Sequence, residues 1–302
     1  MRNSRRTEFR APPETPPASA GHWSDVASDP NAGIVKVHRA RVLRAAWRQP
    51  ISDRIAFIEA KCRDRRVLDI GCVAHDVNRM SSPKWLHGRI AAVAQRCVGV
   101  DLLASEIEEM RKRGYEVVLH DLTTGFEPIA SLGPFDVIVA GELIEHVEDL
   151  GMLFRLARSV LSDGGELIIT TPNPYAPGRV RAGQLGIVWE NVDHIVYAFP
   201  SGIAELCERH GLALAEAAVT GDGFKPWARP GHGKFGVVRL YRIIRRRLGS
   251  KKWLLAGYAT TGVADHVRVE HLPPQETFRR WFRRGRPFLG ETFIYVVTTR
   301  QG

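Results

Sequence analysis

Cysteine is scarce in this chain of 302 residues, which contains four cysteines and no C-x-x-C pair. Cys62, Cys72, Cys97 and Cys207 are scattered along the sequence. Such spacing argues against a disulfide framework and against a structural zinc site. We therefore expect reduced thiols, as in a cytoplasmic protein.

Long apolar runs are also missing. The best candidate for a membrane span, residues 253–264, is short and interrupted by Gly and Thr, so no transmembrane helix is predicted. The N-terminal residues include arginines but no apolar stretch, so we expect no signal peptide. The G-x-G-x-x-G pattern is missing as well, which argues against an NAD-binding dehydrogenase.

Positive charge is present in excess but is unevenly distributed. The formal net charge of the chain is +10. Residues 221–302 hold 17 Lys and Arg against 5 Asp and Glu, a net charge of +12, and the rest of the chain carries −2. This asymmetry indicates an anionic partner for the C-terminal quarter, such as lipid head groups, nucleic acid or an acidic glycan.

Two regions differ from the rest in composition. Residues 1–33 are rich in Pro, Ser, Ala and Arg, so we expect a disordered tail. Residues 222–290 begin with a Gly- and Pro-rich loop and continue into a helical pattern at 235–248, with apolar residues on one face and arginines on another. We predict a basic helical insertion there. Its aromatic and leucine residues favour peripheral contact with an anionic membrane surface over nucleic acid, and a solvated charged face is the third reading.

Between these regions, short apolar runs alternate with helical patterns. Strands are predicted at residues 66–70, 97–100, 116–120, 135–140, 166–171, 212–220 and 292–298. Helices are predicted at residues 34–48, 52–62, 84–96, 105–113, 151–161 and 201–210. In the helix at 105–113, Ser105 and Glu108 form a predicted capping box. The alternation predicts an α/β domain, formed by residues 34–221 and 291–302, with a mostly parallel seven-stranded sheet and helices on both faces.

Acidic residues follow three of the predicted strands. Asp69 and Gly71 close the run VLDIGC, and Asp101 and Asp121 follow the next two strands. In an open α/β sheet, ligands bind beyond the carboxyl ends of the strands. Gly71 has no side chain, which allows the backbone to approach such a ligand closely.

The segments VLDIGC, VGVD, HDL, FDVIVAGELIEHVEDL and LSDGGELIITTPNP, in this order, resemble the motifs of class I S-adenosylmethionine-dependent methyltransferases. The resemblance covers roughly residues 60–220 plus the last strand, and is strongest to the small-molecule and glycan-associated branch. It implies a Rossmann-like fold, S-adenosylmethionine as the cofactor, and a small-molecule, glycan or lipid-linked acceptor, most readily methylated on oxygen. The alternatives are an RNA methyltransferase that uses the basic segment, and a cofactor-less regulatory protein of the same fold.

The resemblance also implies the cofactor contacts, which follow the strand ends. They are Asp69, Gly71, His75, Asp101, Leu102, Asp121, Leu122, Ala140 and Glu142. Asp69 and Gly71 match the residues that hold the amino-acid end of the cofactor. Asp101 matches the acid that accepts both ribose hydroxyls, which suits an ionised carboxylate. Asp121 matches the residue near the adenine amine, and its other reading is a turn-forming acid.

The loop after the first strand departs from the family pattern. The family usually has G-x-G-x-G, whereas this chain has Gly71-Cys72-Val73-Ala74-His75. Val73 and His75 therefore replace the second and third glycines. Either His75 and Asp76 contribute contacts of their own, or the loop binds the cofactor weakly.

Three residues are candidates for catalysis: Glu142, His146 and His194. An acceptor hydroxyl must lose its proton, and a histidine near neutral pH suits that task. His194 falls in a segment where a substrate lid would close, although it could instead cap the following helix. Glu142, Glu145 and His146 are predicted to share a helix face. No metal site is predicted, because that set lacks a further ligand.

Overall fold

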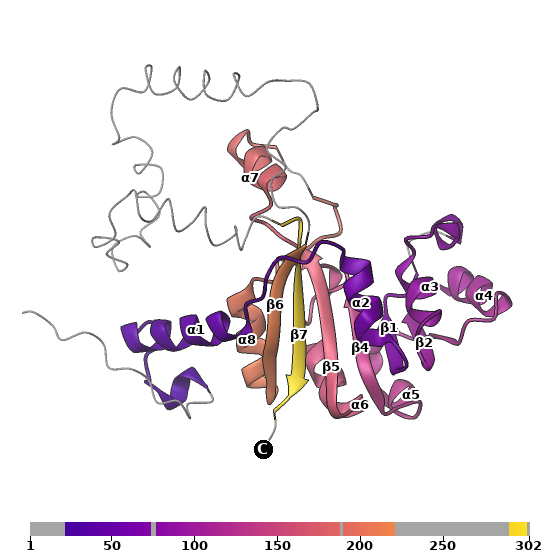
Figure 1. Ribbon diagram of the computed structural model, residues 1–302, viewed down its shortest axis with the longest axis horizontal. Helices are drawn as coiled ribbons and strands as arrows, with labels where there is room; N and C mark the ends of the chain where they lie inside the picture. The colour runs from indigo at the N-terminus through magenta and orange to yellow at the C-terminus, as the bar shows by residue number, and fades with distance from the viewer. Residues whose placement is uncertain (1–21, 74–76, 188–189, 221–289, 301–302) are drawn as a thin grey trace, which may run out of the picture. The chain divides into compact units, whose positions relative to one another are not determined.

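The computed structural model describes residues 22–73, 77–187, 190–220 and 290–300 of the chain. Within these residues, seven strands form one sheet in the order β3-β2-β1-β4-β5-β7-β6 (Figure 1). The strands are β1 (Arg66–Ile70), β2 (Arg96–Asp101), β3 (Val117–Leu119), β4 (Phe135–Gly141), β5 (Leu161–Pro172), β6 (Leu212–Thr220) and β7 (Thr292–Thr299). β1 to β5 pair in parallel, and β7 is antiparallel to both of its neighbours. The predicted mostly parallel, seven-stranded sheet is confirmed.

Helices cover both faces of the sheet. They are α1 (Gly33–Ala46), α2 (Arg54–Cys62), α3 (Leu86–Ala91), α4 (Ala104–Lys112), α5 (Glu127–Ala130), α6 (Gly151–Val160), α7 (Pro177–Gln184) and α8 (Pro200–Arg209). Side chains of a strand alternate between the two faces. Leu68 and Ile70 of β1 therefore pack in a core with α6 and α8, whereas Val67 packs in a second core with α2 and α3.

The last strand returns to the sheet after a long excursion of the chain, as predicted. Thr220 of β6 pairs with Thr292 of β7, and the Glu291 amide donates to the Thr220 carbonyl at 2.9 Å. Residues 221–289 therefore connect two adjacent antiparallel strands. The predicted helix and its arginines lie outside the described residues.

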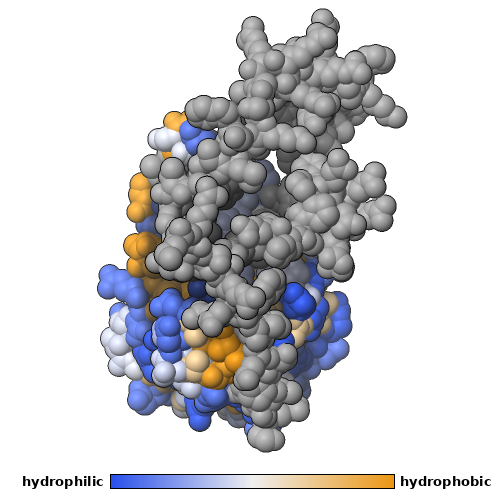
Figure 2. All heavy atoms as spheres, turned by 90° about the vertical axis from the view of Figure 1, so that its left-hand side faces the viewer, coloured by the Kyte–Doolittle hydropathy of each residue, from blue (hydrophilic) through white to orange (hydrophobic). Residues whose placement is uncertain are grey.

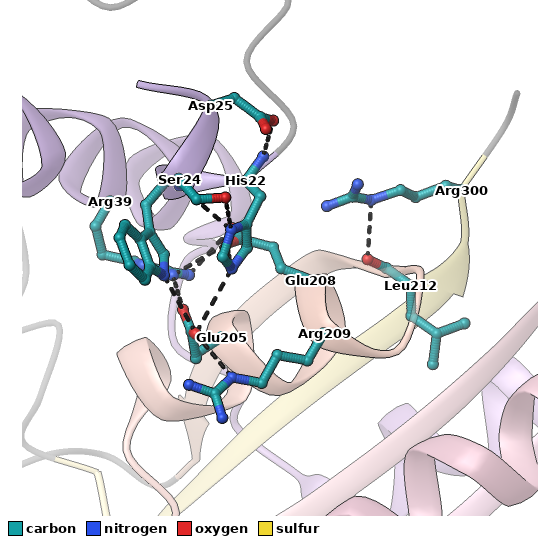
Figure 3. A network of polar contacts seen from close by, with 10 residues as sticks. His22, Ser24, Asp25, Arg39, Glu205, Glu208, Arg209, Leu212 and Arg300 are labelled. Carbon is teal, nitrogen blue, oxygen red and sulfur yellow. Dashed lines mark hydrogen bonds and ion pairs between the residues drawn. The ribbon is translucent and has the colours of Figure 1, made fainter. Parts of the chain in front are cut away.

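Residues 22–33, which were predicted to belong to the disordered tail, contain the short 3-10 helix η1 (Trp23–Asp25) and the first residue of α1, so the prediction is wrong for this part. The helix η1 lies beside α8, and the Trp23 indole donates to Glu205 at 3.2 Å. Arg39 of α1 donates to Glu205 at 2.6 Å and to Glu208 at 3.1 Å (Figure 3). These contacts tie α1 and η1 to α8. The first 21 residues of the predicted tail lie outside the described residues.

The helix predicted at residues 84–96 is shorter than expected. α3 ends at Ala91. Beyond it, the Val93 carbonyl accepts from the Asp64 amide at 3.0 Å, and the Gln95 amide donates to the Arg65 carbonyl at 3.0 Å. These backbone groups bond to the segment before β1, so they cannot continue the helix.

The predicted capping box at Ser105 is wrong. Leu103 is the N-cap of α4, and Ser105 lies inside the helix, where its hydroxyl donates to Glu106. The Asp101 carboxylate accepts from the amides of Leu102 and Leu103, so the chain turns into the helix before Ser105 is reached.

The described residues contain no membrane-spanning helix and no disulfide, as the sequence predicts. No helix among the described residues is long and apolar enough to cross a membrane. Hydrophilic and apolar side chains are interspersed on the face seen in Figure 2. All four cysteines are free thiols. Burial raises the pKa of Cys62 and of Cys207 to about 12, so both thiols stay protonated and unreactive at neutral pH.

Candidate functional site

The carboxyl ends of β1, β2 and β4 meet at one edge of the sheet. Ile70 at the end of β1 pairs with Val100 of β2 and with Ala140 of β4. The strand order reverses between β1 and β4. Such a reversal is where open α/β sheets bind their ligands. This edge therefore brings together the strand ends that carry the predicted cofactor contacts.

Gly71 has the backbone conformation that favours glycine. Its φ is +73°, in the left-handed region. A Cβ atom at this position would lie 3.1 Å from Leu143 Cδ1. Its amide donates to the Val100 carbonyl at 2.9 Å, which closes the turn against β2. His75, the next predicted contact of this loop, lies outside the described residues.

Side chains hold the rest of the turn, which lacks the second glycine of the family pattern. The Trp85 indole donates to the Cys72 carbonyl at 3.1 Å. The Val73 amide donates to Asp101 Oδ2 at 2.9 Å. The turn at residues 71–73 is thus fixed from two sides.

Asp101 lies at the end of β2 with acceptor capacity to spare. Its Oδ1 accepts from the amides of Leu102 at 2.7 Å and Leu103 at 3.3 Å, and its Oδ2 accepts from Val73. A carboxylate offers about four acceptor positions, so a hydroxyl donor still finds one. The Leu102 side chain is 63% exposed beside it and provides an apolar surface. These two residues fit the ribose and the base of an adenosyl group.

Asp69 lies beneath the turn and not on its surface. Its Oδ2 is 2.9 Å from His87 Nδ1, and the side chains of both residues are almost completely buried. A direct contact between Asp69 and the cofactor stays a prediction.

Asp121 and Leu122 are engaged within the protein. Asp121 Oδ1 accepts from the hydroxyl of Thr123 at 2.7 Å and from its amide at 2.8 Å. These hydrogen bonds lower the pKa of Asp121 and cap the 3-10 helix η3 (Leu122–Thr124). The Leu122 side chain packs in the main core. The turn-forming reading of Asp121 is therefore supported, and its predicted place near the adenine remains a prediction.

Glu142 follows β4 in an unusual conformation. Ala140 is buried, and Glu142 has a φ of +57°, which is uncommon for a residue other than glycine. Its amide donates to the Thr170 carbonyl of β5 at 2.9 Å. Its carboxylate is 3.3 Å from Arg54, which also donates to the Thr170 hydroxyl at 2.8 Å. The neighbouring strand and Arg54 thus fix Glu142 at the end of β4.

Glu145, His146 and His194 form a cluster beyond β4. The rings of His146 and His194 lie 4.7 Å apart at an interplanar angle of 81°. One ligand atom from each of the three residues lies within 4.8 Å of the others. The predicted helix face shared with Glu142 is wrong, because Glu142 precedes the single 3-10 turn η4 (Ile144–His146).

Carboxylates orient both histidines of the cluster. His146 Nδ1 is 3.2 Å from Asp193 Oδ2, and His194 Nδ1 is 2.8 Å from Glu190 Oε2. Glu190 also pairs with Arg179, and the Ile195 amide donates to the Glu145 carbonyl at 2.9 Å. The segment that carries His194 is therefore tied to η4. His194 does not cap α8, whose N-cap is Phe199, and its catalytic role stays a prediction.

Glu145 is buried without a normal hydrogen bond from the described residues. The Thr171 hydroxyl lies close by, but it does not have hydrogen-bond geometry toward either carboxylate oxygen. Burial raises the pKa of Glu145 to about 7. Burying a charged carboxylate without a partner costs free energy, so a bound proton or a bound cation would stabilise Glu145. The cluster can therefore exchange a proton with a bound acceptor, or hold a divalent cation between a carboxylate and two imidazoles.

Known proteins are similar to the part of the chain that forms the sheet and its helices. A family model described as a methyltransferase domain matches residues 38–217. The ubiquinone biosynthesis O-methyltransferase of Aromatoleum aromaticum is 24% identical over 65% of this chain and 80% of its own length. The corresponding protein of Azotobacter vinelandii is 27% identical over 72% of this chain and 88% of its own length.

Solved structures show a looser likeness. A SAM-dependent methyltransferase from Archaeoglobus fulgidus aligns with a TM-score of 0.45 and 15% identity, over 87% of this chain and 93% of its own. A likeness at this level carries no argument about the acceptor.

Proposed function

This chain belongs to the class I S-adenosylmethionine-dependent methyltransferases, and from that premise we propose that it methylates an oxygen atom of a small-molecule acceptor. The family membership makes it an enzyme and argues against a cofactor-less regulatory protein. S-adenosylmethionine supplies a methyl group that is already activated on a sulfonium. The protein therefore chiefly has to align the reactants and exclude water.

The strand ends on the β1 and β2 side supply the cofactor contacts of this proposal. Asp101 would accept from the ribose hydroxyls with the acceptor capacity that its backbone contacts leave. Leu102 would cover a face of the base. The turn at Gly71 would lie against the amino-acid end.

The buried Glu145 between two histidines is the observation that carries O-methylation. A hydroxyl nucleophile has to lose its proton, whereas a neutral amine or a thiolate does not need a base of this kind. His146 and His194 are oriented by Asp193 and Glu190 for this role. The names of the two ubiquinone biosynthesis O-methyltransferases reported above also support an oxygen acceptor.

Exposed apolar side chains gather in the segment between β5 and α8. They are Tyr175, Val180, Leu185, Ile187, Val192, Ile195 and Phe199. This segment carries His194 at the same time. Exposed apolar side chains in the segment that carries His194 suit an acceptor that combines a hydroxyl with an apolar body.

A divalent cation is the second candidate for activating the acceptor. The sequence predicts no metal site at Glu142, Glu145 and His146. In the structure His194 takes the place of Glu142, so that Glu145, His146 and His194 offer three ligand atoms within 4.8 Å of one another. A bound cation would lower the pKa of the acceptor hydroxyl. Treatment with EDTA followed by Mg²⁺ or Mn²⁺ separates the two candidates. A cation site predicts loss and recovery of methyl transfer with binding of the cofactor product retained, whereas a base alone predicts no effect of EDTA.

The first test is calorimetric titration of the protein with S-adenosylhomocysteine. The second is transfer of a labelled methyl group from the cofactor to phenols, carboxylic acids, saccharides and lipid-linked saccharides. We expect binding and methylation of a hydroxyl compound. Titration without heat of binding would refute the cofactor site, and label found only on nitrogen or carbon atoms would refute O-methylation.

The RNA alternative and the proposed membrane contact rest on the basic C-terminal segment. A pelleting assay with vesicles of anionic lipid, compared with an RNA gel-shift assay, distinguishes them. RNA binding that weakens steeply with salt, together with label transfer to RNA, would favour the RNA methyltransferase.

A further inference from the structure

His87 and Asp69 form a buried pair directly below the proposed cofactor turn. His87 Nδ1 lies 2.9 Å from Asp69 Oδ2. The exposed fraction is 0% for the side chain of His87 and 3% for that of Asp69. A carboxylate removed from water in this way is stable only with a hydrogen-bonding partner. His87 is the partner that the structure provides.

The surroundings of the His87 ring leave little freedom. The rings of Trp85 and Tyr115 lie 5.5 Å and 5.4 Å from it, centroid to centroid. Gly99 of β2, which pairs with Asp69 of β1, leaves the space that the imidazole fills, because a Cβ atom there would lie 2.8 Å from His87 Cε1. The ring is thus held in place by packing, with its Nδ1 directed at Asp69.

The two ring nitrogens of His87 differ in their hydrogen-bond partners. His87 Nε2 is buried and has no hydrogen-bond partner among the described residues. Cys97 Sγ is the other polar neighbour of Nδ1, at 4.0 Å. Among the described residues, Asp69 is therefore the one strong hydrogen-bond partner of the His87 imidazole.

The same short helix that carries His87 also holds the turn. Trp85, two residues before His87, donates its indole N–H to the Cys72 carbonyl at 3.1 Å. Asp69 and Cys72 stand on either side of Gly71. The beginning of α3 therefore supports both sides of the turn, at a position where the chain lacks the glycines that the family loop usually has.

We propose that His87 is a positioning residue for cofactor binding: it fixes the Asp69 carboxylate and, with Trp85, the turn at residues 71–73. The proposal rests on the proposed cofactor site. The substrate class is the amino-acid end of an adenosyl sulfonium or thioether. His87 acts through Asp69 and the turn, and does not touch the ligand.

Three substitutions test this role, each followed by titration with S-adenosylhomocysteine. His87→Asn keeps an N–H donor close to the position of Nδ1, whereas His87→Gln moves the donor toward Nε2 and His87→Leu removes it. We expect dissociation constants about tenfold or more above wild type for the Gln and Leu variants, and within about threefold for the Asn variant, by analogy with outer-shell partners of binding residues. With an active acceptor, KM for the cofactor should rise in the same order while kcat changes little.

Arg66→Met is a matched control at the opposite end of β1. Arg66 pairs with Asp136 through a 2.8 Å contact, and its loss should lower the melting temperature without changing the affinity for S-adenosylhomocysteine. Equal affinities for wild type and all three His87 variants would overturn the inference and leave the proposed function intact. Affinities that fall equally in the Asn and Gln variants would also overturn the inference, because it requires an N–H donor at the position of Nδ1. A wild-type protein that binds no S-adenosylhomocysteine would instead refute the proposed function.

Discussion

The two halves of the carboxyl edge are built in different ways. The proposed cofactor half consists of the ends of β1, β2, β3 and β4 up to Glu142, and the proposed acceptor half consists of residues 144–146 and 190–199. In the cofactor half, half-buried carboxylates accept from amides close in the sequence, as Asp101 does from Leu102 and Asp121 from Thr123. In the acceptor half, Glu145 meets His194 across almost fifty residues.

This difference separates two kinds of specificity. A strand end that carries its own carboxylate depends on the sheet and on the turn that follows the strand, which the fold itself provides. The acceptor half depends on a long connection between β5 and α8 that can vary without disturbing the sheet. We infer that the acceptor is chosen by the second half alone.

The largest effect is expected from substitutions in the acceptor half. His194→Ala and Glu145→Gln should each lower kcat by about 10²- to 10⁴-fold, because they remove the group that exchanges a proton with the acceptor. Affinity for S-adenosylhomocysteine should stay within about twofold of wild type, because neither residue belongs to the cofactor half. Labelled methyl transfer and calorimetry measure the two quantities.

His210→Ala is the control for these variants. His210 stacks on Phe154 with a centroid distance of 6.0 Å, away from the cluster. It should leave kcat unchanged. A comparable loss of kcat in this variant, or a loss of S-adenosylhomocysteine affinity in the cluster variants, would contradict the division of the edge into two halves.

A smaller effect is expected in the cofactor half. Asp101→Ala should raise the dissociation constant of S-adenosylhomocysteine by about 10- to 100-fold, because charged hydrogen bonds to the ribose and the acceptor for the Val73 amide are lost together. Asp121→Ala should raise the dissociation constant less than Asp101→Ala, because the Asp101 carboxylate also holds the Val73 amide of the turn at residues 71–73, whereas the Asp121 carboxylate accepts from Thr123 of its own turn. Equal effects of the two substitutions would show that the structure ranks them wrongly.

Sequence alone predicts the strands and turns of the proposed cofactor half, because their signals are local, whereas the cofactor contacts themselves stay predictions. The run VLDIGC predicts both the buried strand β1 and the turn at Gly71. Asp69 and Asp101 lie in the last two residues of their strands, and Asp121 follows β3 by two residues. What the sequence could not show is the direction of each carboxylate. Asp69 and Asp101 both follow apolar runs, yet Asp69 faces the buried His87 and Asp101 faces the turn.

The acceptor half resists prediction for the opposite reason. The spacing of Glu142, Glu145 and His146 suggested a helix, but the positive φ of Glu142 and its bond to β5 break that pattern. His194, which lies near Glu145, comes from a segment without regular structure, so no periodicity in the sequence predicts this proximity. α7 was missed because its only local signal is Pro177 at the first helical position.

The smallest effect is expected where the core meets the acceptor half. The Tyr295 hydroxyl of β7 is buried and donates to the Ala198 carbonyl at 2.8 Å, just after the segment that carries His194. Tyr295→Phe should lower the free energy of unfolding by about 1 to 3 kcal/mol, because the buried carbonyl loses its donor. Urea unfolding measures this change.

If the two halves are independent, the affinity for S-adenosylhomocysteine stays the same in the Tyr295→Phe variant while KM for the acceptor rises. A change in cofactor affinity instead would mean that β7, which pairs with β5, couples the two halves through the sheet.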